Sequence, residues 1–81
     1  MAQLFSLGHL TAMDYRKIIT IDPRVENGKP CIRGLPITVM EIITRLADGM
    51  TIEQVLAERT QLTREDIKAC LEFSADQARG L

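Results

Sequence analysis

The second half of the chain carries its hydrophobic residues at the spacing of amphipathic helices. Three stretches follow this pattern: residues 39–49, 52–59 and 64–79. Apolar positions at i, i+3, i+4 and i+7 give each helix one face that can be buried. The pattern therefore predicts three short helices around a single aliphatic core.

Threonine residues mark where the second and third helices begin. Thr51 and Gln54 fit the two positions of a capping box, and Thr63 and Asp66 fit them with a shorter acid. In such a box the hydroxyl accepts a hydrogen bond from the backbone N–H three residues on, and the second side chain returns one. The short turn between the two helices ends at Leu62, which we expect to point inward. The sequence thus predicts a helix-turn-helix.

The first helix has start and stop signals of its own. Thr38 is its expected N-cap, with Glu41 at the capping-box position. Asp48-Gly49 ends it, because glycine readily adopts the left-handed conformation that follows many helices. We expect this helix to pack with the other two.

Short β-branched and turn-forming segments precede the helices. Lys17–Ile21 and Cys31–Arg33 are predicted strands, and Asn27-Gly28 between them favours a turn with positive φ. A two-stranded ribbon is marginal by itself. We therefore expect it to lie on the helices or to pair with the same ribbon of another copy.

A chain of 81 residues is the size of one domain. The expected division is residues 1–12 as an N-terminal extension and 13–81 as a single domain, with the β-ribbon at 17–37 and the trihelical part at 38–79. The extension is mildly apolar, and Met13 is a candidate start of the chain. The alternative is a short helix that packs on the domain or on a second subunit, formed by Leu4, Phe5, Leu7 and Leu10.

Composition narrows the classes of function. The chain has no Trp, one Tyr and two Phe, so it offers no aromatic platform on which single-stranded bases could stack. No apolar run reaches the roughly 18 residues of a membrane span, and residues 1–12 lack a leader pattern. We therefore expect a cytoplasmic protein without a membrane partner.

Catalysis and metal binding are not expected. His9 is the only histidine, which leaves no Ser/His or Cys/His arrangement to build within one chain. Cys31 and Cys70 stand far apart with no histidine near either, so we expect packing residues rather than a zinc site or a redox pair. The sequence predicts no enzyme, no cofactor and no metal.

Charge is distributed unevenly around a net value of -1. Up to Arg33, five basic residues stand against three acidic ones, a balance of +2. After Arg33, five basic residues stand against eight acidic ones, a balance of -3. Because contacts from Lys and Arg to phosphate supply much of the affinity for DNA, the acidic second part predicts weak DNA binding by a monomer.

The opening of the last helix holds the candidate DNA-binding residues, which are Gln61, Thr63, Arg64 and Lys68. A recognition helix presents its first turns to base edges. Arg64 suits a bidentate bond to guanine there, and Lys68 suits a phosphate or a base. The alternative is an ordinary solvated face on which Lys68 and Glu72 form an i, i+4 ion pair.

Basic residues also surround the segment rich in Gly and Pro. Arg24, Lys29 and Arg33 are the candidate partner-binding residues, suited to a phosphate or to an acidic protein surface. The alternative is that the glycines and prolines of residues 28–36 only fix the backbone path. The two interpretations are compatible, because a rigid backbone would hold these charged side chains in fixed positions for a partner.

Three ordered blocks carry a resemblance to a known family: Asn27–Gly34, Ile37–Val39 and Ala47–Gly49. With these blocks the chain resembles the bacterial domain-of-unknown-function family 433 over roughly residues 15–78. The chain departs from the family pattern at Leu35-Pro36, where Thr-Arg is usual, and at Thr38, where the family has proline.

The resemblance implies a homeodomain-like trihelical fold behind a short β segment. It also implies an antitoxin encoded beside a PIN-like toxin of the ribonuclease type. The expected fold class is therefore mainly α, with a short N-terminal β-ribbon followed by a trihelical homeodomain-like helix-turn-helix domain.

Two functional hypotheses follow. The first is an antitoxin-like protein that forms a homodimer or a higher homo-oligomer through the ribbon, binds a PIN-like toxin, and binds its own promoter DNA through residues 63–79. The second is a protein-interaction module with the same trihelical fold that does not bind DNA. The acidic balance after Arg33 favours the second hypothesis.

Overall fold

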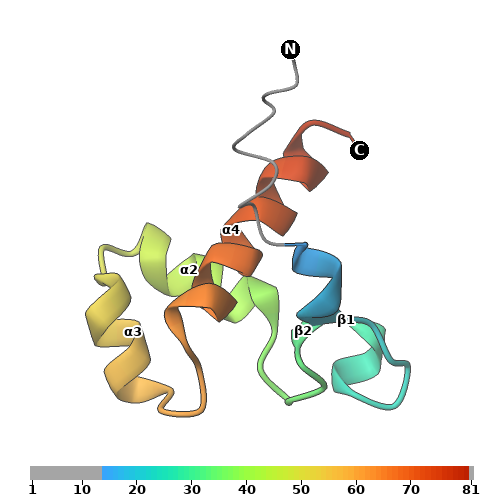
Figure 1. The fold of residues 1–81 in the computed structure, drawn as a ribbon, viewed down its shortest axis with the longest axis horizontal. Coiled ribbons are helices and arrows are strands. Elements are labelled where there is room, and N and C mark those ends of the chain that lie inside the picture. Colours follow the sequence, from blue (N-terminus) through green and yellow to red (C-terminus); the bar gives the residue numbers. More distant parts are fainter. Residues whose placement is uncertain (1–13, 81) are drawn as a thin grey trace.

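Three α-helices and a two-stranded sheet make up the fold of residues 14–80, the part of the chain that the computed structural model describes (Figure 1). The helices are α2 (Val39–Ala47), α3 (Ile52–Glu58) and α4 (Arg64–Ala78). The strands are β1 (Ile19–Thr20) and β2 (Cys31–Ile32), with the short 3-10 helices η1 (Tyr15–Lys17) and η2 (Glu26–Gly28). The predicted fold class is confirmed, whereas the short helix considered for Leu4, Phe5, Leu7 and Leu10 lies outside the described residues.

The longest helix, α4, joins the other elements. In Figure 1, α3 lies on one side of it and the strands lie on the other. Both α2 and α3 pack against α4, and so do η1 and β1. The ribbon therefore lies on the helices, which is one of the two arrangements expected for it.

The capping boxes predicted for α3 and α4 are both complete. At α3, the Thr51 hydroxyl accepts from the Gln54 N–H at 3.1 Å, and the Gln54 side chain accepts from the Thr51 N–H at 2.8 Å. At α4, Thr63 and Asp66 form the same pair of bonds, at 3.2 and 2.9 Å. A helix N-terminus has backbone N–H groups with no partner inside the helix, so these side chains fix where each helix begins.

The box predicted for α2 forms only in part. The Thr38 hydroxyl accepts from the Glu41 N–H at 3.0 Å, as expected for the N-cap. The Glu41 carboxylate does not return the bond, because it pairs instead with the guanidinium of Arg59 and lies 3.5 Å from that of Arg45. Glu41 thus links α2 to the end of α3 rather than capping its own helix.

The predicted end of α2 is confirmed in detail. Gly49 has a φ of +102°, and its N–H bonds to the Leu46 carbonyl at 3.0 Å. The N–H of Met50 bonds to the Arg45 carbonyl at 3.1 Å. This pair of bonds is the Schellman arrangement, which favours glycine at the left-handed position.

The strands are shorter than predicted. They pair antiparallel with Ile19 opposite Ile32 and Thr20 opposite Cys31. Residue 17 belongs to η1 rather than to β1. A φ of +49° at Arg33 ends β2, since a residue in the left-handed region cannot continue a strand. The predicted turn with positive φ is present at residues 26–28, where it forms η2.

The core is aliphatic, as the composition predicts. It consists of Ile19, Ile32, Ile37, Val39, Ile42, Val55, Leu62, Ile67, Ala69 and Cys70. Leu62 is buried in the turn between α3 and α4, as expected. Cys31 and Cys70 are free and buried, and both fill space in the interior.

Two further features are not found between residues 14 and 80. No helix there is both long enough and apolar enough to cross a bilayer. The same stretch brings no three His, Cys, Asp or Glu side chains together as ligands for a metal ion.

Candidate functional site

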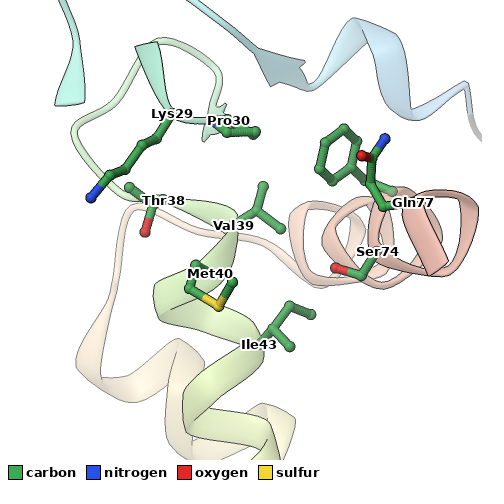
Figure 2. Close-up of a pocket in the computed structure, with 9 residues that line it drawn as sticks. Lys29, Pro30, Thr38, Val39, Met40, Ile43, Ser74 and Gln77 are labelled. Carbon is green, nitrogen blue, oxygen red and sulfur yellow. The ribbon is translucent and has the colours of Figure 1, made fainter. Parts of the chain in front are cut away.

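The described surface has a groove of about 760 Å³ between α2 and the second half of α4, called the α2–α4 groove below (Figure 2). Its lining comprises Lys29, Pro30, Thr38, Val39, Met40, Ile43, Phe73, Ser74 and Gln77. Figure 2 shows Val39 and Ile43 on one wall, with Ser74 and Gln77 on the facing wall. The groove is therefore built by helices that are far apart in the sequence.

One wall follows from the first two turns of α2. Val39 and Ile42 are buried in the core, which places their neighbours Met40 and Ile43 at the edge of the groove. Met40 is 70% exposed, although it is a large apolar residue. Methionine is flexible and polarisable, so it adapts to the shape of an incoming apolar surface.

The other wall depends on an aromatic contact. Phe73 lines the groove from α4, and the ring of Tyr15 packs on it edge to face, with 5.8 Å between the ring centroids. Tyr15 also interacts with the Asp76 carboxylate, which raises the pKa of Tyr15 and lowers the pKa of Asp76. Both contacts fix η1 beside the groove.

The chemistry of the groove is that of an apolar docking surface. Among the described residues, Lys29 is the only charged one in the lining, and Figure 2 shows the Lys29 amino group directed away from the hollow. Ligand sites are commonly apolar with a few polar groups at fixed positions, and an exposed apolar surface marks a site of interaction. The arrangement suits apolar side chains of a protein partner.

A second, more polar hollow of about 490 Å³ surrounds the start of α4. Here Arg33 donates to both carboxylate oxygens of Asp66, at 3.1 and 2.9 Å, and to the carbonyl of Gln61 at 2.8 Å. Asp66 is only 2% exposed, and its hydrogen bonds raise the pKa of Arg33. This ion pair, in which the carboxylate is buried and the guanidinium is exposed, ties the end of β2 to the start of α4.

The predicted DNA-binding residues lie near one another, but most of them are already engaged. Thr63 caps α4, and the Gln61 carbonyl accepts from the Arg33 guanidinium. Arg64 pairs with Glu53 of α3 and lowers the pKa of that carboxylate. Lys68 is exposed and has no ion-pair partner within residues 14–80, so the expected pair with Glu72 does not form.

The three predicted partner-binding residues are at three different places. Lys29 borders the α2–α4 groove, and Arg33 lines the second hollow. Arg24 lines neither, and its guanidinium donates to the Asp22 carboxylate at 3.0 and 3.1 Å, which lowers the pKa of Asp22. Of the three, only Lys29 therefore belongs to the groove.

Apart from Lys29, the lining residues of the groove are not among the site residues predicted from the sequence. Met40 and Phe73 line it, but a helical pattern of apolar residues predicts core positions. The pattern therefore does not mark either residue as part of a site. The one available signal is that Met40 falls outside the apolar stripe of α2.

Comparison with known families gives one match. The family model described as "Protein of unknown function (DUF433)" matches residues 19–74. The matched segment runs from β1 into the second half of α4 and contains every lining residue of the groove except Gln77. Searches of curated proteins and of solved structures found no match.

Proposed function

Because the chain belongs to the DUF433 family, we propose that it is the antitoxin-like member of a toxin–antitoxin pair and that it holds its partner in the α2–α4 groove. The partner that the family resemblance implies is a PIN-like toxin of the ribonuclease type. In this role the chain has no catalytic activity, and any nuclease activity belongs to the partner.

The observation that carries the proposal is the apolar lining of the groove. Met40 is 70% exposed at its edge, beside Ile43 and across from Phe73. Burial of apolar surface is the main favourable term in most protein association, at roughly 25 cal/mol per Å². The toxin would supply apolar side chains to the groove and an acidic group to Lys29, whose charge at the rim would favour the correct orientation.

The test is copurification of the full chain with the product of the adjacent gene. Met40→Glu would place a carboxylate against the apolar walls without a partner, which is costly on burial. We expect at least tenfold weaker binding, which corresponds to about 1.4 kcal/mol.

The matched control is Leu71→Glu, which adds the same charge to α4 at a residue that is 44% exposed and lies outside the groove. We expect this variant to bind like the unmodified chain. Binding that is equally strong in Met40→Glu would rule out the groove as the toxin site. Copurification of a different protein, sensitive to Met40→Glu, would support the alternative of a general protein-interaction module.

The proposal includes a homodimer joined at β1. Among residues 14–80, β1 pairs only with β2, whereas the outer side of β2 forms a bridge between Cys31 and Thr38. The free edge is therefore on β1, and an open edge readily pairs with another strand. Ile21, directly after β1, is 65% exposed and would be covered in such a dimer.

A second candidate function is binding of promoter DNA at the opening of α4. The observation that favours it is the placement of Arg64 and Lys68, which are exposed and one helical turn apart. A gel shift at low salt with the upstream intergenic DNA tests it, because phosphate contacts weaken as salt rises.

If DNA binds there, replacing Arg64 and Lys68 together by alanine should abolish the retardation. Arg24→Ala, which removes an exposed arginine from another part of the surface, should keep it. Absence of retardation with the unmodified chain, both alone and with the toxin, would exclude this candidate and leave the protein-binding function in place.

A further inference from the structure

We propose that residues 1–13 dock into the α2–α4 groove of the same chain. The described structure shows the groove with an apolar lining and Met40 exposed at its edge. An apolar surface of this kind is stabilised by an occupant with apolar side chains. The segment that precedes Asp14 has the composition of such an occupant.

Residues 1–13 suit the groove in their charge as well as in their hydrophobicity. Residues 1–13 contain no Asp, Glu, Lys or Arg, so no charge would have to leave water on docking. Their large apolar side chains are those of Met1, Leu4, Phe5, Leu7, Leu10 and Met13. The groove itself has only Lys29 as a charged lining residue, at its rim.

The point where this segment joins the domain lies between the two hollows, since Asp14 lines the second hollow and Tyr15 packs on Phe73 of the groove. Asp14 is the N-cap of η1, and the next residue, Tyr15, packs its ring on Phe73, which lines the groove. The segment therefore joins the domain beside the α4 wall. The attachment also makes docking intramolecular, which raises the effective concentration of the occupant.

The length of the segment is sufficient. Thirteen residues span up to roughly 43 Å when extended, and about 20 Å as a helix. The longest dimension of the described structure is 41 Å. Either conformation therefore reaches across a groove whose α4 wall is in contact with η1, so no second copy of the chain is needed.

Docking of this segment would regulate the site. A protein partner would have to displace residues 1–13, so the segment would lower the partner's apparent affinity until it is released. This consequence rests on the proposed function, but the docking itself does not.

The test is photo-crosslinking within the full chain. Ser6→Cys provides a thiol for a benzophenone maleimide at a polar position of the segment. The reagent should select this thiol, because Cys31 and Cys70 are buried and burial raises the pKa of both, that of Cys70 to about 12. Irradiation at low protein concentration is followed by peptide mass spectrometry and by measurement of the product mass.

We expect crosslinks to Met40, Ile43 or Phe73 in a product with the mass of a single chain. Adding Leu7→Ser and Leu10→Ser should remove these crosslinks, because the docking side chains are lost. The matched control, Gln3→Ser with Thr11→Ser, changes two polar residues and should keep them.

Crosslinks spread over exposed sites such as Leu71 and Ile21 would overturn the proposal, and so would crosslinks found only in a product of doubled mass. No partner is present in the experiment, so its result is separate from that of the toxin test. If both proposals hold, adding the toxin should reduce the crosslinks to Met40.

Discussion

At the scale of single residues, Asp66 links two elements of the fold, and the sequence pattern around it indicates only one of these contacts. Its carboxylate accepts from the Thr63 N–H and from two nitrogens of Arg33. Asp66 is only 2% exposed. A carboxylate buried to this extent needs hydrogen bonds or an opposite charge to be tolerated. One side chain thus caps α4 and fixes the end of β2 against it.

We predict that Asp66→Ala lowers the free energy of unfolding by about 2–3 kcal/mol, from the lost cap and the lost bonds to a charged group. Arg33→Ala should destabilise as well, because it leaves the buried carboxylate without its ion-pair partner. Urea denaturation of both single variants and the double variant gives the coupling energy between the two side chains.

The double variant should lose clearly less stability than the sum of the two single variants. Purely additive losses would mean that the two side chains contribute independently. Lys68→Ala is the matched control, since Lys68 is an exposed cation of the same helix without an ion pair in residues 14–80. Its effect should stay within about 0.5 kcal/mol.

At the scale of elements, the helices could be predicted because their signals are local. The boxes of Thr51 and Thr63 need only residues three positions away. The stop at Gly49 likewise needs only a residue that tolerates a φ of +102°. The residues that start or stop a helix lie within one turn of its end, so the predicted helix starts and the end of α2 are correct.

The strands could be predicted in position but not in length. Their extent depends on pairing between residues 19–20 and 31–32, which lie more than ten positions apart. The β-branched pattern does not indicate that η1 precedes β1. It also does not indicate that Arg33, after β2, has a left-handed conformation. The β-branched residues therefore predicted strands that extend beyond the two paired positions.

The candidate groove could not be predicted, because it exists only once α2 and α4 are packed together. Arg24, Lys29 and Arg33 surround the segment rich in Gly and Pro, and this suggested that they present their charges together. In the structure Arg33 turns to Asp66, whereas Lys29 borders the groove. Met40 gave the only local hint, as an apolar residue outside the buried stripe of α2.

At the scale of the whole molecule, most arginine side chains form ion pairs with acidic residues of the same chain. The net charge is -1, and five arginines of the described residues pair with acids of the helical part: Arg33, Arg45, Arg59, Arg64 and Arg79. Little positive charge is left to attract a polyanion, which normally steers proteins to DNA. The apolar groove is therefore the stronger basis for function, and protein partners are the better supported class.

The proposed homodimer makes a prediction at this same scale. If β1 pairs with β1 of a second copy, the mass in solution should be twice the chain mass of 9.1 kDa. Ile21 is 65% exposed next to that edge, and Ile21→Lys would bring like charges close together across the two-fold axis, which destabilises strand pairs. We expect this variant to sediment as a monomer in analytical ultracentrifugation.

The control is Leu71→Lys, which adds the same charge at an exposed apolar residue of α4. A β1-linked dimer should survive this change, because Leu71 lies away from the sheet, on a different element. A monomeric mass for the unmodified chain at concentrations well above those of the toxin assay would contradict the dimer. A dimer broken by Leu71→Lys but not by Ile21→Lys would place the interface on the face of α4 that carries Leu71, which lies outside the groove.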